Sequence, residues 1–133
     1  MNGDDSNRNG GHLALLLWAC DPDDPVRLAT PFFHASAAAA MDAEVEIHFS
    51  ARSVLLLKPG LAAQLYAGSD RSKSIYGYMQ EAASFGARFL ACSDALASQG
   101  LRLDELIPEV DGAGGAVRFM ARALDPDWRV LSF

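Results

Sequence analysis

The chain has 133 residues, of which 50% are hydrophobic and 21% are charged, a composition typical of a globular protein that can form a hydrophobic core without disulfides or metals. The formal net charge is −6 and the 11 Lys and Arg residues are scattered, which argues against a nucleic-acid-binding protein. The apolar runs fall short of the ~20 residues that a membrane helix needs, so we expect a soluble protein with no membrane partner.

The amino-terminal segment is polar and contains no apolar run of the kind found in signal peptides. We therefore expect residues 1–12 to form a disordered tail and residues 13–133 to form a single domain. The two cysteines, Cys20 and Cys92, are too few and too widely spaced for a secreted disulfide framework or a zinc site. Reduced thiols in the cytoplasm are the expected state.

Three strand patterns are clear in the first two thirds of the chain. Residues 13–20 (LALLLWAC) and 87–92 (ARFLAC) are apolar at nearly every position, which is typical of central strands covered on both faces. Residues 44–49 (EVEIHF) alternate polar and apolar side chains, which predicts an edge strand with one face in water. Two shorter strands are predicted at residues 108–110 and 128–133.

Helical patterns lie between these strands. One helix is expected within residues 25–42, with Pro31 either in the first turn after a Thr30 cap or at an internal kink. Another is expected over residues 74–85, with Gly86 as its carboxyl-terminal cap. The remaining predicted helical segments are residues 94–98, the turn at 103–107 and a helix that begins near residue 112.

This alternation predicts an α/β protein, a flavodoxin-like three-layer sandwich around a mostly parallel five-stranded sheet. The strand order 2-1-3-4-5 accommodates two central apolar strands and a half-exposed second strand. In that order the first and third strands are neighbours, so Cys20 and Cys92 are expected to flank the same crevice.

Residues 51–66 (ARSVLLLKPGLAAQLY) lengthen the connection after the second predicted strand. They are apolar around a Pro-Gly break. On the surface of a monomer they would form a large apolar patch, so the segment is expected to mark a subunit interface or a lid.

Cys92 follows an apolar strand and precedes a short predicted helix, so it is either an inert core residue or a reactive thiol at the edge of the sheet where such folds bind ligands. A helix that begins at Ser93 would favour the thiolate, although Asp94 opposes it. A cation from elsewhere is therefore required for strong activation. The candidates are Lys58, Arg71 and Lys73.

Cys20 is the weaker nucleophile because three aspartates, Asp21, Asp23 and Asp24, follow it and nearby negative charge raises the pKa of a thiol. It is an inert residue, a second sulfur acceptor or the resolving partner of Cys92.

His48 lies on the polar side of the predicted edge strand. It is either a solvated residue or a base near the crevice. His34 is assigned to a core or interface position and His12 to the tail. No histidine spacing suits a metal, and no cofactor motif is present. The run Gly112, Gly114 and Gly115 could bind an anion or simply allow tight packing.

The order of elements from Phe89 to Met120 (FLACSDALASQGLRLDELIPEVDGAGGAVRFM) resembles the DsrE/DsrF-like family of sulfur-relay proteins, also described as TusD/YchN-like. The resemblance extends back through residues 44–58 and 31–45 and covers the chain from Leu13. It implies a flavodoxin-like fold, assembly into trimers or hexamers, and a cysteine that carries sulfur as a persulfide. Cys92 matches the place of that cysteine, whereas His48 stands where an aromatic residue is common.

Three functions follow from these observations. The first is a sulfurtransferase or persulfide carrier in which Cys92 accepts sulfane sulfur and passes it to a partner protein, with Cys20, His48 and Ser93 as accessory candidates. The second is a non-catalytic oligomeric binding or scaffold protein of the same fold. The third is a Cys20/Cys92 redox pair, which requires the two Cα atoms within ~7 Å.

Overall fold

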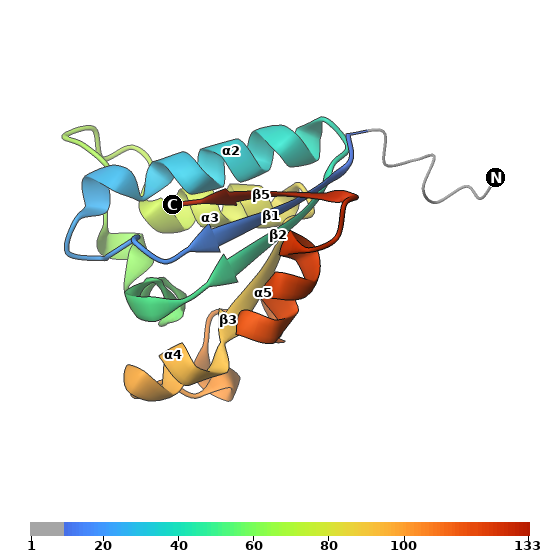
Figure 1. The fold of residues 1–133 in the computed structure, drawn as a ribbon. Coiled ribbons are helices and arrows are strands. Elements are labelled where there is room, and N and C mark those ends of the chain that lie inside the picture. The colour runs from blue at the N-terminus through green and yellow to red at the C-terminus, as the bar shows by residue number, and fades with distance from the viewer. Residues whose placement is uncertain (1–9) are drawn as a thin grey trace.

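The computed structural model describes residues 10–133 and contains a five-stranded sheet in which every strand pair is parallel (Figure 1). The spatial order of the strands is β4-β3-β2-β1-β5. Their bounds are β1 His12–Leu17, β2 Glu44–Phe49, β3 Arg88–Cys92, β4 Val110–Gly114 and β5 Trp128–Ser132.

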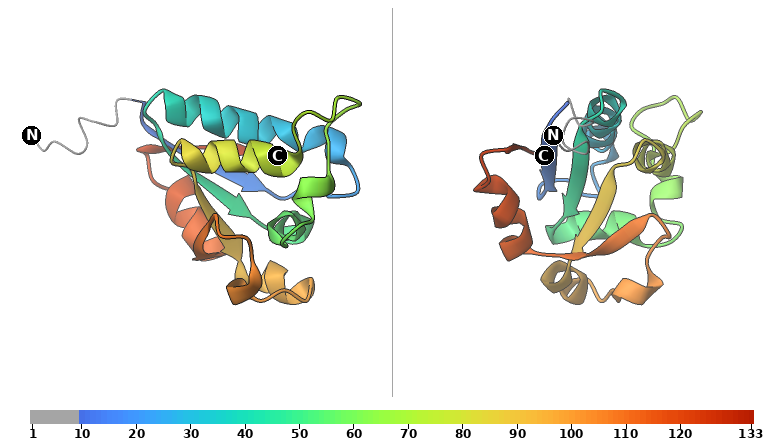
Figure 2. Two further views of the ribbon diagram at one scale, coloured as in Figure 1. Left: turned by 180° about the vertical axis from the view of Figure 1, so that it is seen from behind. Right: turned by 90° about the vertical axis from the view of Figure 1, so that its right-hand side faces the viewer.

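Helices cover both faces of this sheet (Figure 2). Helices α2 and α3 lie on one face, α5 lies on the opposite face, and α4 follows the carboxyl end of β3. The bounds of the α-helices are α2 Ala29–Ala40, α3 Ile75–Ser84, α4 Ser93–Ser98 and α5 Ala116–Ala123. Short 3₁₀ helices are η1 Pro25–Arg27, η2 Ala51–Leu57, η3 Ala62–Gln64 and η4 Leu103–Glu105. The predicted three-layer α/β class is therefore confirmed.

Local sequence signals explain where α3 begins and ends. The Ser74 hydroxyl accepts a hydrogen bond from the Gly77 N–H at 3.1 Å, which satisfies one of the unpaired donors of the first turn. After the helix, Gly86 adopts a φ of 106°, a left-handed conformation that a residue with a side chain rarely takes. The predicted helix and its glycine cap are both confirmed. In α2, by contrast, Pro31 lies in the first turn, but the capping position is Leu28 and not Thr30.

The predicted strand order is wrong, because β2 occupies the centre of the sheet and not its edge. β2 pairs with β1 on one side and β3 on the other. Its polar residues Glu46 and His48 are buried, because α5 covers that face and supplies the charged partner of Glu46. Both faces of β2 are therefore buried. The apolar residues of the strand face the α2/α3 layer, and its polar residues face α5 and not solvent.

The main core lies between the sheet and the α2/α3 layer. Three fully buried rings meet there: Phe32 of α2 packs against Phe49 and Phe89, with ring centroids 6.0 and 6.2 Å away. Fully burying side chains of this size contributes roughly 1.5–3 kcal/mol each. This cluster fixes α2 across β2 and β3.

The segment 51–66 was expected to expose an apolar patch, and the structure corrects this. Its apolar side chains Val54, Leu56 and Leu57 are fully buried in the core of the same chain. The Leu57 carbonyl also accepts a hydrogen bond from the Ile107 N–H at 2.9 Å. The segment therefore closes the carboxyl end of the sheet, and its apolar composition needs no partner subunit.

Of the predicted tail, residues 1–9 lie outside the described residues. His12, which was assigned to the tail, instead opens β1, where its ring lies 3.4 Å from the Glu44 carboxylate and packs against Trp128. Among residues 10–133 no helix is long and apolar enough to cross a membrane.

Candidate functional site

A cavity of about 350 Å³ opens at the carboxyl ends of the strands, on the face of the sheet covered by α5. This is the edge at which open α/β sheets bind ligands. The side chains around it are mostly apolar, and the polar ones come from His48, Ser50 and Cys92. Its lining residues are Leu16, His48, Phe49, Ser50, Leu90, Cys92, Gly114, Gly115, Ala116, Phe119 and Met120.

Cys92 is the last residue of β3 and occupies the capping position of α4. It is half-buried, it lines the cavity, and its thiol forms no disulfide. On the neighbouring strand it lies opposite Gly114, which has no side chain to cover it. The predicted position of Cys92 at the carboxyl end of a strand is therefore observed, in a place that a small molecule can enter.

Cys20 is placed differently. Only 4% of its surface is exposed, it belongs to the hydrophobic core, and burial raises its pKa to about 11. It is absent from the lining of the cavity. The expectation that Cys20 and Cys92 flank one crevice is wrong, because it depended on β1 and β3 being neighbours, whereas β2 lies between them.

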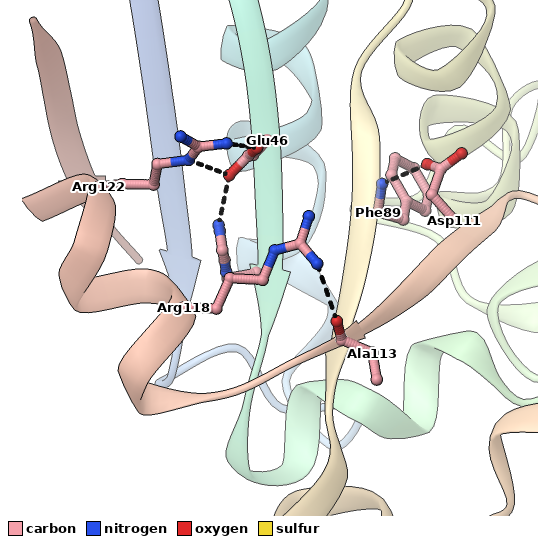
Figure 3. A network of polar contacts seen from close by, with 7 residues as sticks. Glu46, Phe89, Asp111, Ala113, Arg118 and Arg122 are labelled. Carbon is pink, nitrogen blue, oxygen red and sulfur yellow. Dashed lines mark hydrogen bonds and ion pairs between the residues drawn. The ribbon is translucent and has the colours of Figure 1, made fainter.

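The polar centre of this face is an ion pair between Glu46 of β2 and Arg122 of α5. The guanidinium donates through Nε to Oε1 at 3.1 Å and through Nη2 to Oε2 at 2.7 Å, as Figure 3 shows. Burial alone would raise the pKa of Glu46, but the hydrogen bonds from Arg122 and His48 outweigh it and hold that pKa below its ordinary value. Glu46 is thus a buried, charged carboxylate.

His48 is held by the same carboxylate. Its Nε2 lies 3.0 Å from Glu46 Oε1, and the Phe119 ring packs edge-on against the imidazole with centroids 5.2 Å apart. Burial lowers the pKa of His48 despite the opposing effect of Glu46, so the ring is neutral at neutral pH. The expectation of a solvated histidine is therefore wrong. The histidine lies at the cavity, where the alternative interpretation placed it.

The neutral ring has a defined orientation. Because charged Glu46 is an acceptor only, His48 donates through a protonated Nε2, which leaves Nδ1 as an unprotonated acceptor. Within residues 10–133 Nδ1 has no hydrogen-bond partner, and it lies 3.8 Å from the position that a Cβ on Gly114 would take. A buried base is thus directed at the strand position paired with Cys92.

The cations proposed from the sequence lie elsewhere. Lys73 pairs with Glu81 at 2.9 Å, Arg71 stacks on Tyr66, and Lys58 does not line the cavity. The positive charges that act on His48 are instead Arg118 and Arg122, both on α5. Arg118 donates to the Ala113 carbonyl at 3.4 Å, beside the cavity (Figure 3).

Of the three glycines in the run 112–115, one is required for close packing. A Cβ on Gly114 would lie 3.2 Å from Leu90 Cβ, so a larger residue would push into the cavity wall, whereas Gly112 and Gly115 face open space. Ser93 is exposed and absent from the cavity lining. Among residues 10–133 no group of three or more His, Cys, Asp or Glu side chains is placed to hold a metal.

Sequence reasoning missed Glu46, Arg122 and Phe119. One signal was available: two ionisable residues at alternate positions of a strand, Glu46 and His48, together with a late amphipathic helix that carries arginines four residues apart, Arg118 and Arg122. Their pairing requires the long β4-α5-β5 connection to place α5 over β2, which no local pattern specifies.

The fold and the site define a parallel α/β protein with a free thiol in a cavity at the carboxyl ends of its strands. A family model for the DsrE/DsrF-like family matches residues 15–133, and the chain belongs to that family, which is associated with sulfur relay. No curated protein matches the chain in sequence.

Solved structures share the fold. The ychN protein of E. coli matches with a TM-score of 0.71 and 16% identity, over 92% of this chain and 99% of that one. A protein of unknown function from Methanobacterium thermoautotrophicum, MTH1491, matches with a TM-score of 0.65 and 20% identity, over the same shares of the two chains. At these identities the likeness extends to the fold alone.

Proposed function

We propose that the protein accepts sulfane sulfur on Cys92 as a persulfide and passes it to a partner protein, as a sulfurtransferase or carrier. The observation that supports this proposal most directly is the contrast between the two thiols: Cys92 lines an open cavity, whereas Cys20 is sealed in the core. A persulfide carrier needs a reachable thiol and space for the added sulfur, and both are present at Cys92.

The test is mass spectrometry of the intact chain after incubation with an organic persulfide. We expect one added sulfur on the wild-type chain, its loss after treatment with a thiol reductant, and no addition to Cys92→Ser. Cys20→Ser is the matched control, and it should load as the wild type does. Loading that persists in Cys92→Ser, or that is absent from the wild type, would exclude the proposal.

The second function, a non-catalytic oligomeric protein, has its own supporting observation on α5. Val117 and Leu124 are 87% and 77% exposed, and together with Ala116, Met120 and Ala121 they line a shallow apolar hollow beside the cavity. An exposed apolar helix face of this kind favours subunit association. We propose that the chain forms a homo-oligomer in the cytoplasm, with a trimer or hexamer as the expected size.

Light scattering coupled to size-exclusion chromatography tests the assembly. We expect Val117→Asp combined with Leu124→Asp to reduce the mass to that of a monomer, while Met41→Asp, an exposed apolar residue after α2, leaves it unchanged. A persulfide-loading oligomer would combine both functions. An oligomer whose Cys92 does not load sulfur would favour the scaffold.

A further inference from the structure

The cavity contains a base as well as a thiol. His48 has only 4% of its surface exposed, yet its Nδ1 has no hydrogen-bond partner within residues 10–133, and the residue lines the same cavity as Cys92. Among the described residues the buried side-chain atom without a partner is Ser36 Oγ, so Nδ1 of His48 is not sealed and can be reached from the cavity. A ligand proton or a thiol proton in the cavity would satisfy it.

The register of the sheet gives the spacing between the base and the thiol. His48 pairs with Leu90 on β3, and Cys92 is two residues further along that strand, with its side chain directed to the same face. Two residues of rise and one strand spacing place the two Cα atoms roughly 8 Å apart. Gly114 pairs with Cys92 on the other side of β3, and a Cβ there would lie 3.8 Å from Nδ1, so its missing side chain leaves space beside both groups. Nδ1 and the thiol can therefore meet directly or through one water molecule.

The base is fixed in its productive form by a second and a third residue. Glu46 accepts the Nε2 proton and so selects the tautomer with a bare Nδ1, and Arg122 fixes the Glu46 carboxylate from α5. This order of a base and a carboxylate that orients it is the arrangement that activates nucleophilic thiols and hydroxyls.

We propose that His48 is the proton acceptor for the Cys92 thiol, with Glu46 as its positioning residue. This inference rests on the proposed sulfur transfer. His48 takes the thiol proton at Nδ1, and the Cys92 thiolate attacks the outer sulfur of an organic persulfide. The new S–S bond forms from the thiolate electron pair, and the pair of the broken S–S bond leaves with the donor thiolate. That leaving group takes the proton back from His48, so no external oxidant or reductant is needed.

The charged groups around the ring are Glu46 on β2 and Arg118 and Arg122 on α5, with the titratable Cys92 on β3. Glu46 stabilises the imidazolium formed during transfer, whereas the two arginines oppose it and return the ring to its neutral form. The base therefore cycles and does not remain protonated.

The pH dependence of Cys92 chemistry tests the inference in wild type, His48→Gln and the control His34→Gln, which changes an exposed histidine of α2. Two rates are measured, persulfide loading by an organic persulfide and alkylation by iodoacetamide. We expect His48→Gln to slow loading and alkylation at pH 7, the loading rate by about 100-fold. Both rates should approach those of the wild type at alkaline pH, where hydroxide removes the thiol proton. His34→Gln should match the wild type throughout.

A wild type that loads sulfur with the same rate and pH profile as His48→Gln would overturn the inference and leave the proposed function intact. If the wild type does not load sulfur, the proposed function fails, and the alkylation profile alone decides whether His48 governs the thiol. If His48→Gln does not fold, nitrogen NMR of the wild-type ring decides. A proton on Nε2 and a bare Nδ1 support the inference, and a protonated Nδ1 at pH 7 overturns it.

Discussion

Glu46 and Arg122 are 76 residues apart in the chain and form a two-point ion pair, with Nη2 and Oε2 2.7 Å apart, in the layer between the central strand and α5. This pair holds the only α-helix that covers the cavity face among the described elements. It also fixes the carboxylate that orients His48. Stability of the α5 layer and the orientation of His48 thus depend on the same contact.

Removing the cation of this pair should destabilise the protein. Arg122→Met leaves the fully buried Glu46 carboxylate without its charged partner, and we expect a loss of about 3 kcal/mol in the free energy of unfolding. Urea denaturation measures it. Arg118→Met is the control on the same helix, because Arg118 is exposed and makes one long hydrogen bond, and it should cost about 0.5 kcal/mol or less. Equal losses in the two variants would contradict this role of the pair.

Stability should fall with acid in two ranges. His48 has a folded-state pKa below 6.5, so the unfolded chain binds the proton more readily, and stability declines as pH falls from about 6.5 toward the folded pKa. Glu46 has a folded-state pKa below 4.5, so its contribution is present above that pH and is lost as pH falls through the folded pKa. Unfolding free energies across pH test both. His48→Gln should flatten the upper range, and it should also weaken the lower one, because Glu46 loses one of the hydrogen bonds that lower its pKa.

The two thiols should differ in native-state reactivity. We expect iodoacetamide at pH 8 to modify Cys92, while Cys20, whose pKa burial raises to about 11, reacts only when the chain unfolds. Peptide mapping of the alkylated native and urea-unfolded protein gives the comparison. Rapid modification of Cys20 in the folded protein would show that the β1 end of the sheet opens.

Gly114 should control access to the cavity. A valine at this position would place its Cβ 3.2 Å from Leu90 Cβ and its methyl groups toward His48, so Gly114→Val should slow modification of Cys92 by bulky thiol reagents about 10-fold or more. This estimate corresponds to about 1.4 kcal/mol. Gly112→Val, on the same strand but facing open space, is the matched control. Similar labelling rates for both variants would place the entry route elsewhere.

The donor should be an uncharged organic sulfur compound. The cavity lining is mostly apolar and contains no lysine or arginine, Arg118 beside it already hydrogen-bonds the Ala113 carbonyl, and the net charge of the chain is −6, so the anionic thiosulfate gains little stabilisation there. We expect an organic trisulfide to form its adduct on Cys92 faster than thiosulfate adds a sulfur there, in side-by-side mass spectrometry. Met120→Lys, at the mouth of the cavity, should narrow that difference, whereas His34→Lys on the far face should not.

The amino-acid sequence by itself determined the elements whose causes are local. The apolar run before Cys92 predicted β3, Ser74 and Gly86 predicted the two ends of α3, and the alternation of strands and helices predicted the α/β class. These signals depend on neighbours within a few residues. They also placed Cys92 at the carboxyl end of a strand, which is the part of the site that the sequence revealed.

Only the tertiary structure decided which strands are neighbours and which polar residues are buried. From the sequence alone, a strand with Glu46 and His48 at alternate positions is predicted to have one face in solvent. In the structure the strand is central, because Arg122, 76 residues further along the chain, pairs with the buried Glu46 carboxylate. For the same reason the apolar segment 51–66 was assigned to the surface, although Val54 and Leu57 complete the core of the chain itself. Burial and charge pairing are properties of contacts between distant segments, so they are decided only when the sheet is assembled.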